Sequence, residues 1–505
     1  MAVFPGEPQS SGFPVWQVCA VLASLVGPPL LAIGLYARHV KKRPSRHRTA
    51  TVLVLGDIGR SPRMMYHAES LARAGWETHL VGYGDTTPIP SLLETPRVHL
   101  HHLHNPPSLL LRLPWVLRAP IRVVTQVFSV MYICVFKIPC NTEILLVQNP
   151  PSIPTLLLAQ IISNTTRTKL IIDWHNTGYS ILAMRLGESS PIVRIAKWFE
   201  RTFGREAYCH LFVTYALQKF LVNEWHLQGR SVVLHDRPPS QFQHTEISAQ
   251  LSLWRRIGPA IDPPLPKRLH TTDIRRTGFT EMTPDGPALR PDRPAFILSA
   301  TSWTADEDFS ILLTALDSYQ AVKTSGVSDL PGIAMIITGR GELRAEFERQ
   351  VAKREKAGLW PDICVRCMFL SARDYPLLLG CGDLGISMHQ SSSGRDLPMK
   401  VVDMFGSGMP VLARGFACID ELVKDGKNGR VFDNEAELGA QLIDTLVGFP
   451  HAPKLEALKE YFKPKFPSSP GRRVTAPGKE VEWSSWDDNW DAVMKRGVLD
   501  FRRAE

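Results

Sequence analysis

Short apolar runs alternate with segments of helical periodicity along most of this chain. The first run, residues 51–55, is continuous and contains β-branched side chains, as expected for a strand that is buried on both faces. Pro62 opens the helix that follows and Gly75 ends it, before extended character resumes at 78–81. We expect further strands at 144–147, 169–173, 211–214, 231–234, 295–299, 333–338, 364–370 and 383–388. This alternation predicts an α/β fold with parallel sheets.

The periodicity fails between residues 237 and 292, where Pro, Thr, Arg and Gln dominate. We expect this segment to be a linker or a surface insertion that is partly disordered. It separates a first half, 50–236, from a second half, 293–450. A tail, 451–505, completes the chain. Its three tryptophans at helical spacing are typical of a packed helix face: Trp483, Trp486 and Trp490.

An apolar segment near the N-terminus, residues 16–36, is uncharged and about long enough to span a bilayer. Trp16 and Tyr36 stand at its two ends, where amphipathic rings favour the membrane interface. Basic residues follow it, whereas a cleaved signal peptide carries them in front, so an uncleaved anchor is the preferred interpretation. The positive-inside rule then predicts a lumenal segment 1–13, a transmembrane helix 14–37, a basic juxtamembrane segment 38–49 and a cytosolic body.

The net charge of +9 over 505 residues does not indicate a nucleic-acid-binding protein. More than half of this charge lies in the first 50 residues, and the remainder is spread over the body without a basic stripe. The eight cysteines are scattered, as is typical of free thiols in a reducing compartment. We therefore expect no nucleic-acid partner.

The segment 108–137 combines basic residues with an apolar run. Arg112, Arg118 and Arg122 precede residues 123–136, which are too short to cross a membrane. A buried helix and a membrane-facing helix both fit this pattern. The second is favoured because the basic residues precede the apolar part, as they would at anionic headgroups.

Polar side chains follow several predicted strands, at the edge where open α/β sheets bind ligands. Asp57 lies in the glycine-rich turn 56–61 after the first strand, and His175 follows the strand at 169–173. Either side chain could accept a proton. Each also has a structural interpretation, since Asp57 could cap the helix that begins at Pro62 and His175 could be a hydrogen-bonded core residue.

The stretch from His389 to Ala413 has the pattern of a strand end, a Ser- and Gly-rich loop and a helix that begins near Pro398. Backbone amides and the positive end of a helix dipole suit a phosphate, and Lys400 adds a charge. Asp396 and Asp403 flank the same turn. An ordinary loop between a strand and a helix is the alternative.

Two patterns invite a metal interpretation that we do not favour. Four histidines alternate with apolar residues over 98–104, which fits the solvated face of an edge strand. Asp306, Glu307 and Asp308 stand at the start of a predicted helix, where carboxylates are favoured by the dipole. We therefore assign no metal site.

The turn string GDIGRSPRMMYHA resembles the opening motif of the chitobiosyldiphosphodolichol β-mannosyltransferases. Further strings in both halves resemble the same family: LLVQNPPSIPTL, LIIDWHNTGYSI, TSWTADEDFSILL, SARDYPLLLGCGDLGISMHQSSSGRDLPMKVVDMFGSGMPV and NGRVF. The likeness extends with gaps from about 50 to 433. It implies the GT-B architecture, in which two Rossmann-like parallel-sheet domains face each other across a cleft, here with an N-terminal transmembrane helix.

This resemblance implies a membrane-anchored enzyme of N-glycan precursor assembly on the cytosolic face of the endoplasmic reticulum. The donor substrate would be GDP-mannose, the acceptor dolichol-diphosphate-linked chitobiose, and the product β-linked. The resemblance assigns the acceptor to 50–236, the donor to 293–450 and a helix that crosses back to the first domain to 451–505. Further partners would be membrane lipids and other enzymes of the same pathway. No tightly bound cofactor is expected, and metal dependence stays open.

The site roles follow from the resemblance and from charge. Asp403 matches the second acid of the E-x7-E motif of related enzymes, whereas Arg395 stands where the first acid is expected, a departure that fits an inverting reaction. The general base is Asp57 or His175, with Asp57 slightly ahead. The acceptor-binding residues would be Gly59, Arg60 and Ser61, and the donor-binding residues Gly339, Arg340, Ser392, Ser393, Gly394, Asp396, Lys400 and Asp403.

Two other functions remain compatible with the sequence. The first is a GT-B lipid-linked sugar transferase with a different donor or a retaining mechanism. The second is a membrane-tethered scaffold with an inactive transferase fold.

Overall fold

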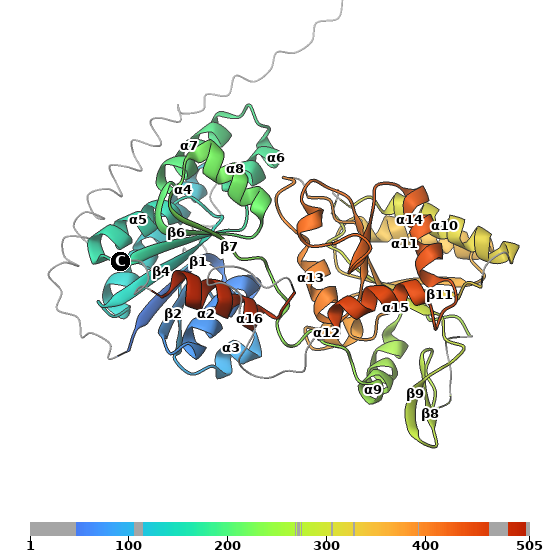
Figure 1. Cartoon of the computed structure of the whole chain (residues 1–505). Helices are drawn as coiled ribbons and strands as arrows, with labels where there is room; N and C mark the ends of the chain where they lie inside the picture. Colours follow the sequence, from blue (N-terminus) through green and yellow to red (C-terminus); the bar gives the residue numbers. More distant parts are fainter. Residues whose placement is uncertain are drawn as a thin grey trace, which may run out of the picture. The chain divides into compact units, whose positions relative to one another are not determined.

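The computed structural model describes residues 47–105, 115–267, 269, 273, 275–304, 307–326, 329–391, 393–463 and 483–500. The predicted anchor 14–37 and most of the segment 38–49 lie outside these residues. The chain forms two compact units, which are considered one at a time (Figure 1). The first unit contains Met1–Leu211 and Leu221–Ser231, and the second contains Phe212–Phe220 and Val232–Glu505.

A seven-stranded sheet forms the centre of the first unit, with the order β3-β2-β1-β4-β5-β6-β7. Its pairings of β1 with β2 and β4, of β2 with β3, and of β4 with β5 are parallel. The strands are β1 (Thr49–Asp57), β2 (Glu77–Tyr83), β3 (Val98–His102), β4 (Thr142–Asn149), β5 (Lys169–Trp174), β6 (Glu206–Phe212) and β7 (Gln228–Val233). Because β1 pairs with β2 on one side and β4 on the other, the strand order reverses there, and a crevice is expected at its carboxyl end.

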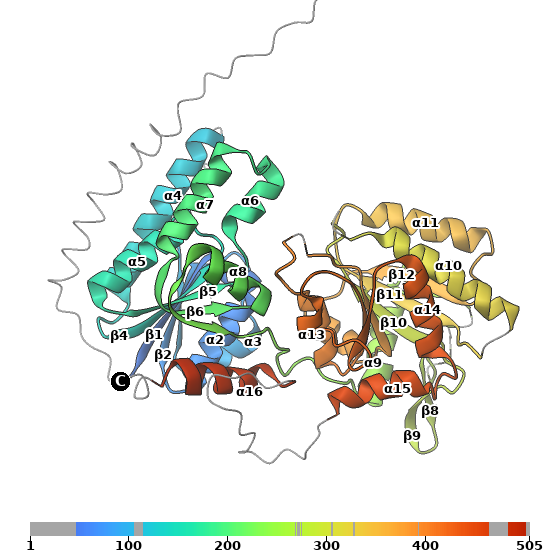
Figure 2. The ribbon, with the colours of Figure 1, turned by 45° about the horizontal axis from the view of Figure 1, so that its top comes forward.

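Helices lie on both faces of this sheet (Figures 1 and 2). They are α2 (Pro62–Arg73), α3 (Pro90–Glu94), α4 (Trp115–Tyr132), α5 (Thr155–Thr166), α6 (Gly178–Leu186), α7 (Pro191–Phe203) and α8 (Tyr215–Trp225), of which only residues 221–225 belong to this unit. Because helices cover both faces of the sheet, seven of the nine residues of β1 are buried. This explains the continuous apolar run in its sequence.

The second unit contains a six-stranded parallel sheet with the order β12-β11-β10-β13-β14-β15. Its strands are β10 (Ala295–Ala300), β11 (Ile333–Thr338), β12 (Ile363–Met368), β13 (Leu384–Ser387), β14 (Val411–Arg414) and β15 (Gly429–Phe432). Its helices are α10 (Phe309–Ser325), α11 (Arg344–Lys356), α12 (Asp374–Leu379), α13 (Met399–Gly406), α14 (Glu435–Leu446) and α15 (Pro453–Lys459). The strand order reverses between β10 and β13.

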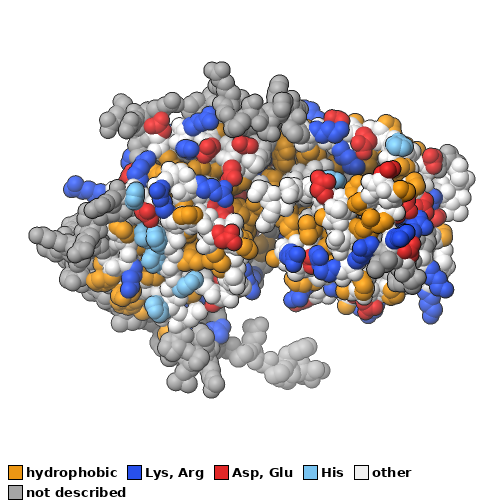
Figure 3. Space-filling model, turned by 90° about the horizontal axis from the view of Figure 1, so that it is seen from below, with side chains coloured by type: hydrophobic (Ala, Val, Ile, Leu, Met, Phe, Trp, Pro, Cys, Tyr) orange, Lys and Arg blue, Asp and Glu red, His pale blue; other side chains and the backbone are white. Residues whose placement is uncertain are grey.

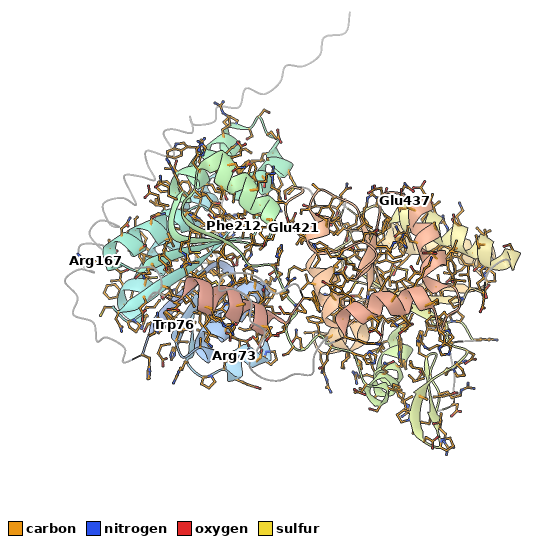
Figure 4. The ribbon with its side chains drawn as sticks, in the orientation of Figure 1. Arg73, Trp76, Arg167, Phe212, Glu421 and Glu437 are labelled. Atoms are coloured by element: carbon orange, nitrogen blue, oxygen red, sulfur yellow. The ribbon has the colours of Figure 1, made fainter. Side chains whose placement is uncertain are left out.

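Two hydrophobic clusters cover the two faces of this sheet. Ile297 of β10 packs with Leu312 of α10 in one cluster, and its neighbour Leu298 packs with Val402 of α13 in the other. This alternation is the period of a strand with two buried faces. Glu437 near the start of α14 (Figure 4) completes a cap, because its amide donates to Asn434 Oδ1 at 3.0 Å.

The segment 237–292, expected from its composition to be a linker or insertion, contains regular structure. It holds α9 (Ile247–Ile257) and the antiparallel pair β8 (Thr280–Thr283) and β9 (Gly286–Leu289). Leu253 and Trp254 of α9 are buried in the core cluster of the second unit. The Pro-rich flanks hid the helical spacing of these apolar residues.

The other patterned segments are described in part. Trp486 and Trp490 begin and end α16 (Trp486–Trp490) and are both buried, and a π-helical segment, Asp491–Val498, follows. The crossing of this tail to the first domain stays a prediction. Helix α4 and the π-helical turn Ile133–Lys137 fall within the segment 108–137, of which residues 108–114 lie outside the description.

No helix in the described ranges combines the length and the apolar character that crossing a bilayer requires. The histidine-rich strand β3 lies at the edge of its sheet, as predicted. His99 lies 2.8 Å from Glu77, and His79 lies 2.9 Å from His101 on the neighbouring strand. Figure 3, which shows the molecule from below, has several histidine side chains close together on the first unit.

Candidate functional site

Asp57 ends β1 at the point where the strand order reverses. Its carboxylate accepts hydrogen bonds from the Thr86 amide at 3.1 Å and from the Thr86 hydroxyl at 2.6 Å. Burial raises the pKa of Asp57, but these hydrogen bonds and one from the Gly59 amide outweigh it and leave the pKa below its usual value. Asp57 therefore fixes the loop that carries Thr86, and no side-chain bond from it caps α2.

The turn after Asp57 presents one exposed cation. Arg60 Nε lies 3.5 Å from Asp57 Oδ2, and the Arg60 side chain is largely solvent-accessible. Gly59 is required by close packing, because a Cβ there would lie 2.4 Å from Thr86 Oγ1. The Ser61 hydroxyl donates to the Asp57 carbonyl at 3.1 Å. Arg60 is thus the member of the predicted acceptor-binding trio whose side chain is available to a ligand.

His175, immediately after β5, is oriented by a buried carboxylate. Its Nε2 lies 2.9 Å from Oδ2 of Asp173, and its backbone amide donates to the Asn149 carbonyl at 2.9 Å. The His175 side chain is about one-quarter exposed, whereas that of Asp173 is fully buried. In the part of the chain that the structure describes, no hydrogen bond involves His175 Nδ1. The His175 ring is therefore oriented by Asp173, and its Nδ1 can accept a proton.

Asp173 is the centre of a buried cluster. The Arg63 guanidinium of α2 binds both its carboxylate oxygens, and His67 Nε2 lies 3.4 Å from Oδ2. Burial would raise the pKa of Asp173, yet the Arg63 charge and His175 hold it well below its usual value. The cluster joins the helix that follows the Asp57 turn to the loop that carries His175.

The sequence analysis did not identify Asp173 and Arg63, although each stands at a position where its charge requires a partner. Asp173 interrupts an apolar strand, and a buried charge there requires a partner. Arg63 occupies the first turn of α2, where a cation opposes the helix dipole unless a carboxylate compensates it.

In the second unit, Gly339 and Arg340 follow β11. Gly339 has a φ of 146°, and a Cβ there would lie 1.8 Å from the Thr301 carbonyl oxygen. Only glycine fits this approach. The Arg340 guanidinium is exposed and lies 3.7 Å from the centre of the Phe369 ring. Arg340 is therefore a positioned cation at the carboxyl edge of the sheet.

The loop after β13 is organised by Asp396. Its carboxylate accepts hydrogen bonds from the hydroxyls of Ser391 and Ser393, and Gly394 has a left-handed φ of 65°. Asp396 thus stabilises the conformation of the loop through these hydrogen bonds. Ser392, predicted to bind the donor, lies outside the described residues.

Helix α13 carries Lys400 and Asp403 on adjacent turns. Lys400 is exposed, and its Nζ lies 5.5 Å from the centre of the Tyr375 ring. The Tyr375 hydroxyl lies 3.2 Å from Asp403 Oδ2. Burial raises the pKa of Asp403 to about 7, against the lowering effects of Lys400 and of Tyr375. Asp403 therefore takes up a proton near neutral pH, which no pattern in the sequence indicated.

Two further contacts that the sequence did not indicate lie within the second unit. The Thr214 hydroxyl donates to the Arg395 carbonyl at 2.6 Å, so that the loop after β13 is tied to the segment 212–220. Glu421 (Figure 4) accepts from the Tyr215 and Ala216 amides at 2.6 and 2.8 Å, at the first turn of α8. The first contact holds the loop after β13, and the second holds the segment Ile419–Glu421.

The acidic run before α10 is structural. Asp308 caps the helix, because its carboxylate accepts from the Ser310 amide at 3.0 Å. Glu307 is bound by the Thr301 hydroxyl and by the Trp303 amide at 3.1 Å, and Asp306 lies outside the described residues. Capping is confirmed for Asp308. Across the described ranges, no group of three or more His, Cys, Asp or Glu side chains is arranged to hold a metal ion.

Proteins of known name are similar to this chain over nearly its whole length. A human protein named chitobiosyldiphosphodolichol beta-mannosyltransferase is 37% identical over 488 residues, which are 95% of this chain and 99% of the human protein. A Yarrowia lipolytica protein of the same name is 39% identical over 433 residues, 84% of this chain and 85% of its own. An Arabidopsis thaliana protein named UDP-glycosyltransferase TURAN is 38% identical over 426 residues, 79% of this chain and 89% of its own. No protein-family model matches the chain.

Solved glycosyltransferase structures share the fold. WaaG, a glycosyltransferase involved in lipopolysaccharide biosynthesis, aligns with a TM-score of 0.53 at 12% identity and covers 88% of this chain and 99% of its own. Anabaena Alr3699/HepE in complex with UDP and glucose aligns with a TM-score of 0.52 at 14% identity, covering 82% and 94%. The two-domain, parallel-sheet α/β fold of GT-B type is thereby confirmed.

Proposed function

The chain belongs to the chitobiosyldiphosphodolichol β-mannosyltransferase family, and we propose that it transfers mannose to chitobiose carried on dolichol diphosphate. The product is a β-1,4-linked mannoside, the first mannose of the N-glycan precursor. The observation that carries this proposal is the 37% identity to the human relative over 95% of this chain and 99% of that protein. A match of this extent spans both halves of the chain.

The donor of a glycosyltransferase of this kind is a nucleotide sugar, and the proposed donor here is GDP-mannose. Its leaving group is a diphosphate that gains negative charge in the transition state. The exposed cations Arg340 and Lys400 supply the compensating charge. Asp403, on the same helix as Lys400, is the proposed partner of the ribose.

The proposed reaction is a single displacement with inversion. His175 removes the proton from the acceptor hydroxyl, the oxygen attacks the anomeric carbon of the α-linked donor, and GDP leaves with the bonding electrons. Asp173 is a positioning residue, because its hydrogen bond at 2.9 Å orients the His175 ring and its charge stabilises the imidazolium that forms.

His175 is preferred over Asp57 as the base on the basis of their partners. Asp57 accepts three hydrogen bonds and has a lowered pKa, so its affinity for a proton is weak. Asp57 instead organises the turn that presents Arg60. The Arg60 guanidinium, being largely exposed, is the proposed contact of the acceptor diphosphate.

The proposed location is the endoplasmic reticulum membrane, with the two folded units in the cytosol. Residues 16–36 form an uncharged apolar segment and are followed by six basic residues before the first strand. A lipid-linked acceptor is confined to the bilayer, so an anchored enzyme encounters it by diffusion in two dimensions.

The proposal is tested by incubating the purified full chain with GDP-[14C]mannose and a chitobiosyl-diphosphate lipid, then digesting the product. We expect a labelled lipid from which β-mannosidase releases mannose and which α-mannosidase leaves intact. Release by α-mannosidase would overturn the inverting mechanism. Donor binding without transfer would support the inactive-scaffold alternative.

A different nucleotide is the second candidate, because one relative is named a UDP-glycosyltransferase. Parallel assays with UDP-glucose and UDP-N-acetylglucosamine separate the two donors. Transfer from a UDP-sugar at a kcat/KM equal to or above that with GDP-mannose would replace the proposed donor.

A further inference from the structure

The hairpin formed by α6 and α7 of the first unit exposes several large apolar side chains. Helix α6 has no buried residue, although six of its nine residues are apolar or aromatic. Four large side chains on the hairpin are strongly exposed: Met184 at 61%, Leu186 at 46%, Ile192 at 40% and Trp198 at 61%. Large apolar side chains that are exposed together on one hairpin are a candidate interaction surface.

The exposed charges on this hairpin are mostly positive. Arg185, Arg194, Lys197 and Arg201 are exposed, while Glu188 is the one exposed acid in the fully described range 178–203. The other acid of the range, Glu200, is buried. A surface that mixes apolar side chains, an exposed tryptophan and several cations has the composition of a helix at a membrane interface.

Glu200 fixes the hairpin to the candidate catalytic loop. Its carboxylate accepts from the Gly178 and Tyr179 amides at 2.8 and 3.1 Å, at the first turn of α6, and from Asn149 Nδ2 at 2.7 Å. Asn149 in turn accepts the His175 amide at 2.9 Å. Helix α6 begins three residues after His175, so the exposed surface and the candidate base are parts of one connected structure.

Helix α4 also exposes large apolar side chains and cations. Figures 1 and 2 both show α4 beside α7 in the first unit. Phe128, Tyr132 and Phe136, spaced four residues apart on α4 and the π-helical turn, are exposed by 40%, 46% and 47%. Arg118 and Arg122 of α4 are exposed as well.

We propose that the α6–α7 hairpin is a bilayer-docking surface, which lies on the headgroups of an anionic membrane and holds the His175 loop at the lipid interface. The occupant is a bilayer because exposed cations lie among the exposed apolar residues of the hairpin, a composition suited to a negatively charged lipid surface. A second copy of the chain would bring like charges together. The inference concerns how the folded unit contacts lipid, and it does not depend on the sugar that is transferred.

The first test is direct contact. Met184→Cys in the reconstituted full chain, labelled with a nitrobenzoxadiazole fluorophore, is compared with a label at Leu359→Cys, a leucine of the second unit that is 57% exposed. The unsubstituted protein, labelled in parallel, gives the contribution of the native cysteines. In vesicles of phosphatidylcholine with phosphatidylserine, lipids with a quencher near the headgroup should quench the Met184 label and leave the Leu359 label unchanged. Equal quenching of the two labels, or quenching of neither, would overturn the proposal.

The second test is kinetic and uses Met184→Asp/Trp198→Asp with Leu359→Asp as the matched control. With a dolichol-length acceptor in vesicles, the KM of the double variant should rise about tenfold or more, because two apolar anchors are lost. With a short, water-soluble chitobiosyl diphosphate and no bilayer, KM and kcat should stay at the level of the control. An equal loss on the soluble acceptor would overturn the docking role in favour of a catalytic or folding role. A raised KM for the long acceptor in detergent without a bilayer would also overturn it, because the surface would then bind the prenyl chain itself.

Discussion

The Arg63 guanidinium binds both carboxylate oxygens of Asp173, with Nε 2.8 Å from Oδ2 and Nη2 3.0 Å from Oδ1. The two residues are 110 positions apart in sequence, and both side chains are almost fully buried. This pair connects α2, which follows the Asp57 turn, to the loop that carries His175. It provides the rigid support that the proposed general base, His175, would require.

The Arg63–Asp173 pair can be measured with a double-mutant cycle. We expect Arg63→Met and Asp173→Asn each to lower the free energy of unfolding of the first unit by about 3–5 kcal/mol, since each leaves a buried group without its charge partner. Urea denaturation of the double variant should show a smaller loss than the sum of the two single losses, with a coupling above about 1 kcal/mol. Additive losses would mean that the two side chains stabilise the fold independently.

Asp57→Asn separates the structural role of this residue from a catalytic one. The lowered pKa means that the ionised carboxylate stabilises the fold above the ordinary pKa of an aspartate, and that this stabilisation is lost as the pH falls through the lowered value. The variant should therefore be less stable than the wild type by about 1–2 kcal/mol at pH 7 and should approach it in acid. Denaturation curves from pH 7 to 3 provide the comparison, and a difference that grows in acid would contradict the assignment.

Asp403→Asn should change the dependence of stability on pH in the opposite direction. Because burial raises the pKa of Asp403 to about 7, the folded state favours the protonated acid, and stability falls as the pH rises from about 4 towards 7. Asparagine imitates the protonated form. The variant should thus have the higher melting temperature at pH 8, by about 2 °C or more, and little advantage at pH 5. Parallel melting curves across this range would argue against a raised pKa.

The cations of the second unit should act on the donor. Arg340→Ala and Lys400→Ala are each expected to weaken GDP binding by about tenfold, since each removes a charge that is proposed to bind the diphosphate. Isothermal titration calorimetry with GDP measures this loss. Arg349→Ala, at an exposed arginine of α11 that pairs with Glu346, is the matched control and should bind GDP normally. Weakening of the control to the same degree would indicate a general effect of net charge.

The strands could be predicted because each is a short apolar run with a clear end. The range 333–338 coincides with β11, and 364–370 overlaps β12 at Ile363–Met368. The first of these strands precedes the loop in which Arg340 was recognised. The helix α9 was missed because prolines and polar residues surround its apolar positions, so that composition concealed a periodicity that is present in the sequence.

The candidate site was predictable only where one segment supplied the whole pattern. Gly339, Arg340 and Lys400 stand out locally, since glycines and cations follow a strand or open a helix. The partner of His175 depends on a fold that brings α2 to the end of β5, a contact that no local pattern encodes. The Tyr375–Asp403 contact, which joins two helices, was hidden for the same reason.

The measurement that tests the account most directly is kcat of His175→Ala beside that of Asp57→Asn, at saturating GDP-mannose and acceptor. Loss of the general base should lower kcat of His175→Ala by about 100- to 10,000-fold. GDP binding should be unchanged, because His175 lies in the first unit and the donor loops in the second. Asp57→Asn should keep kcat within about tenfold of the wild type. Near-normal turnover of His175→Ala, or a larger loss in Asp57→Asn, would contradict the assignment of His175 as the base.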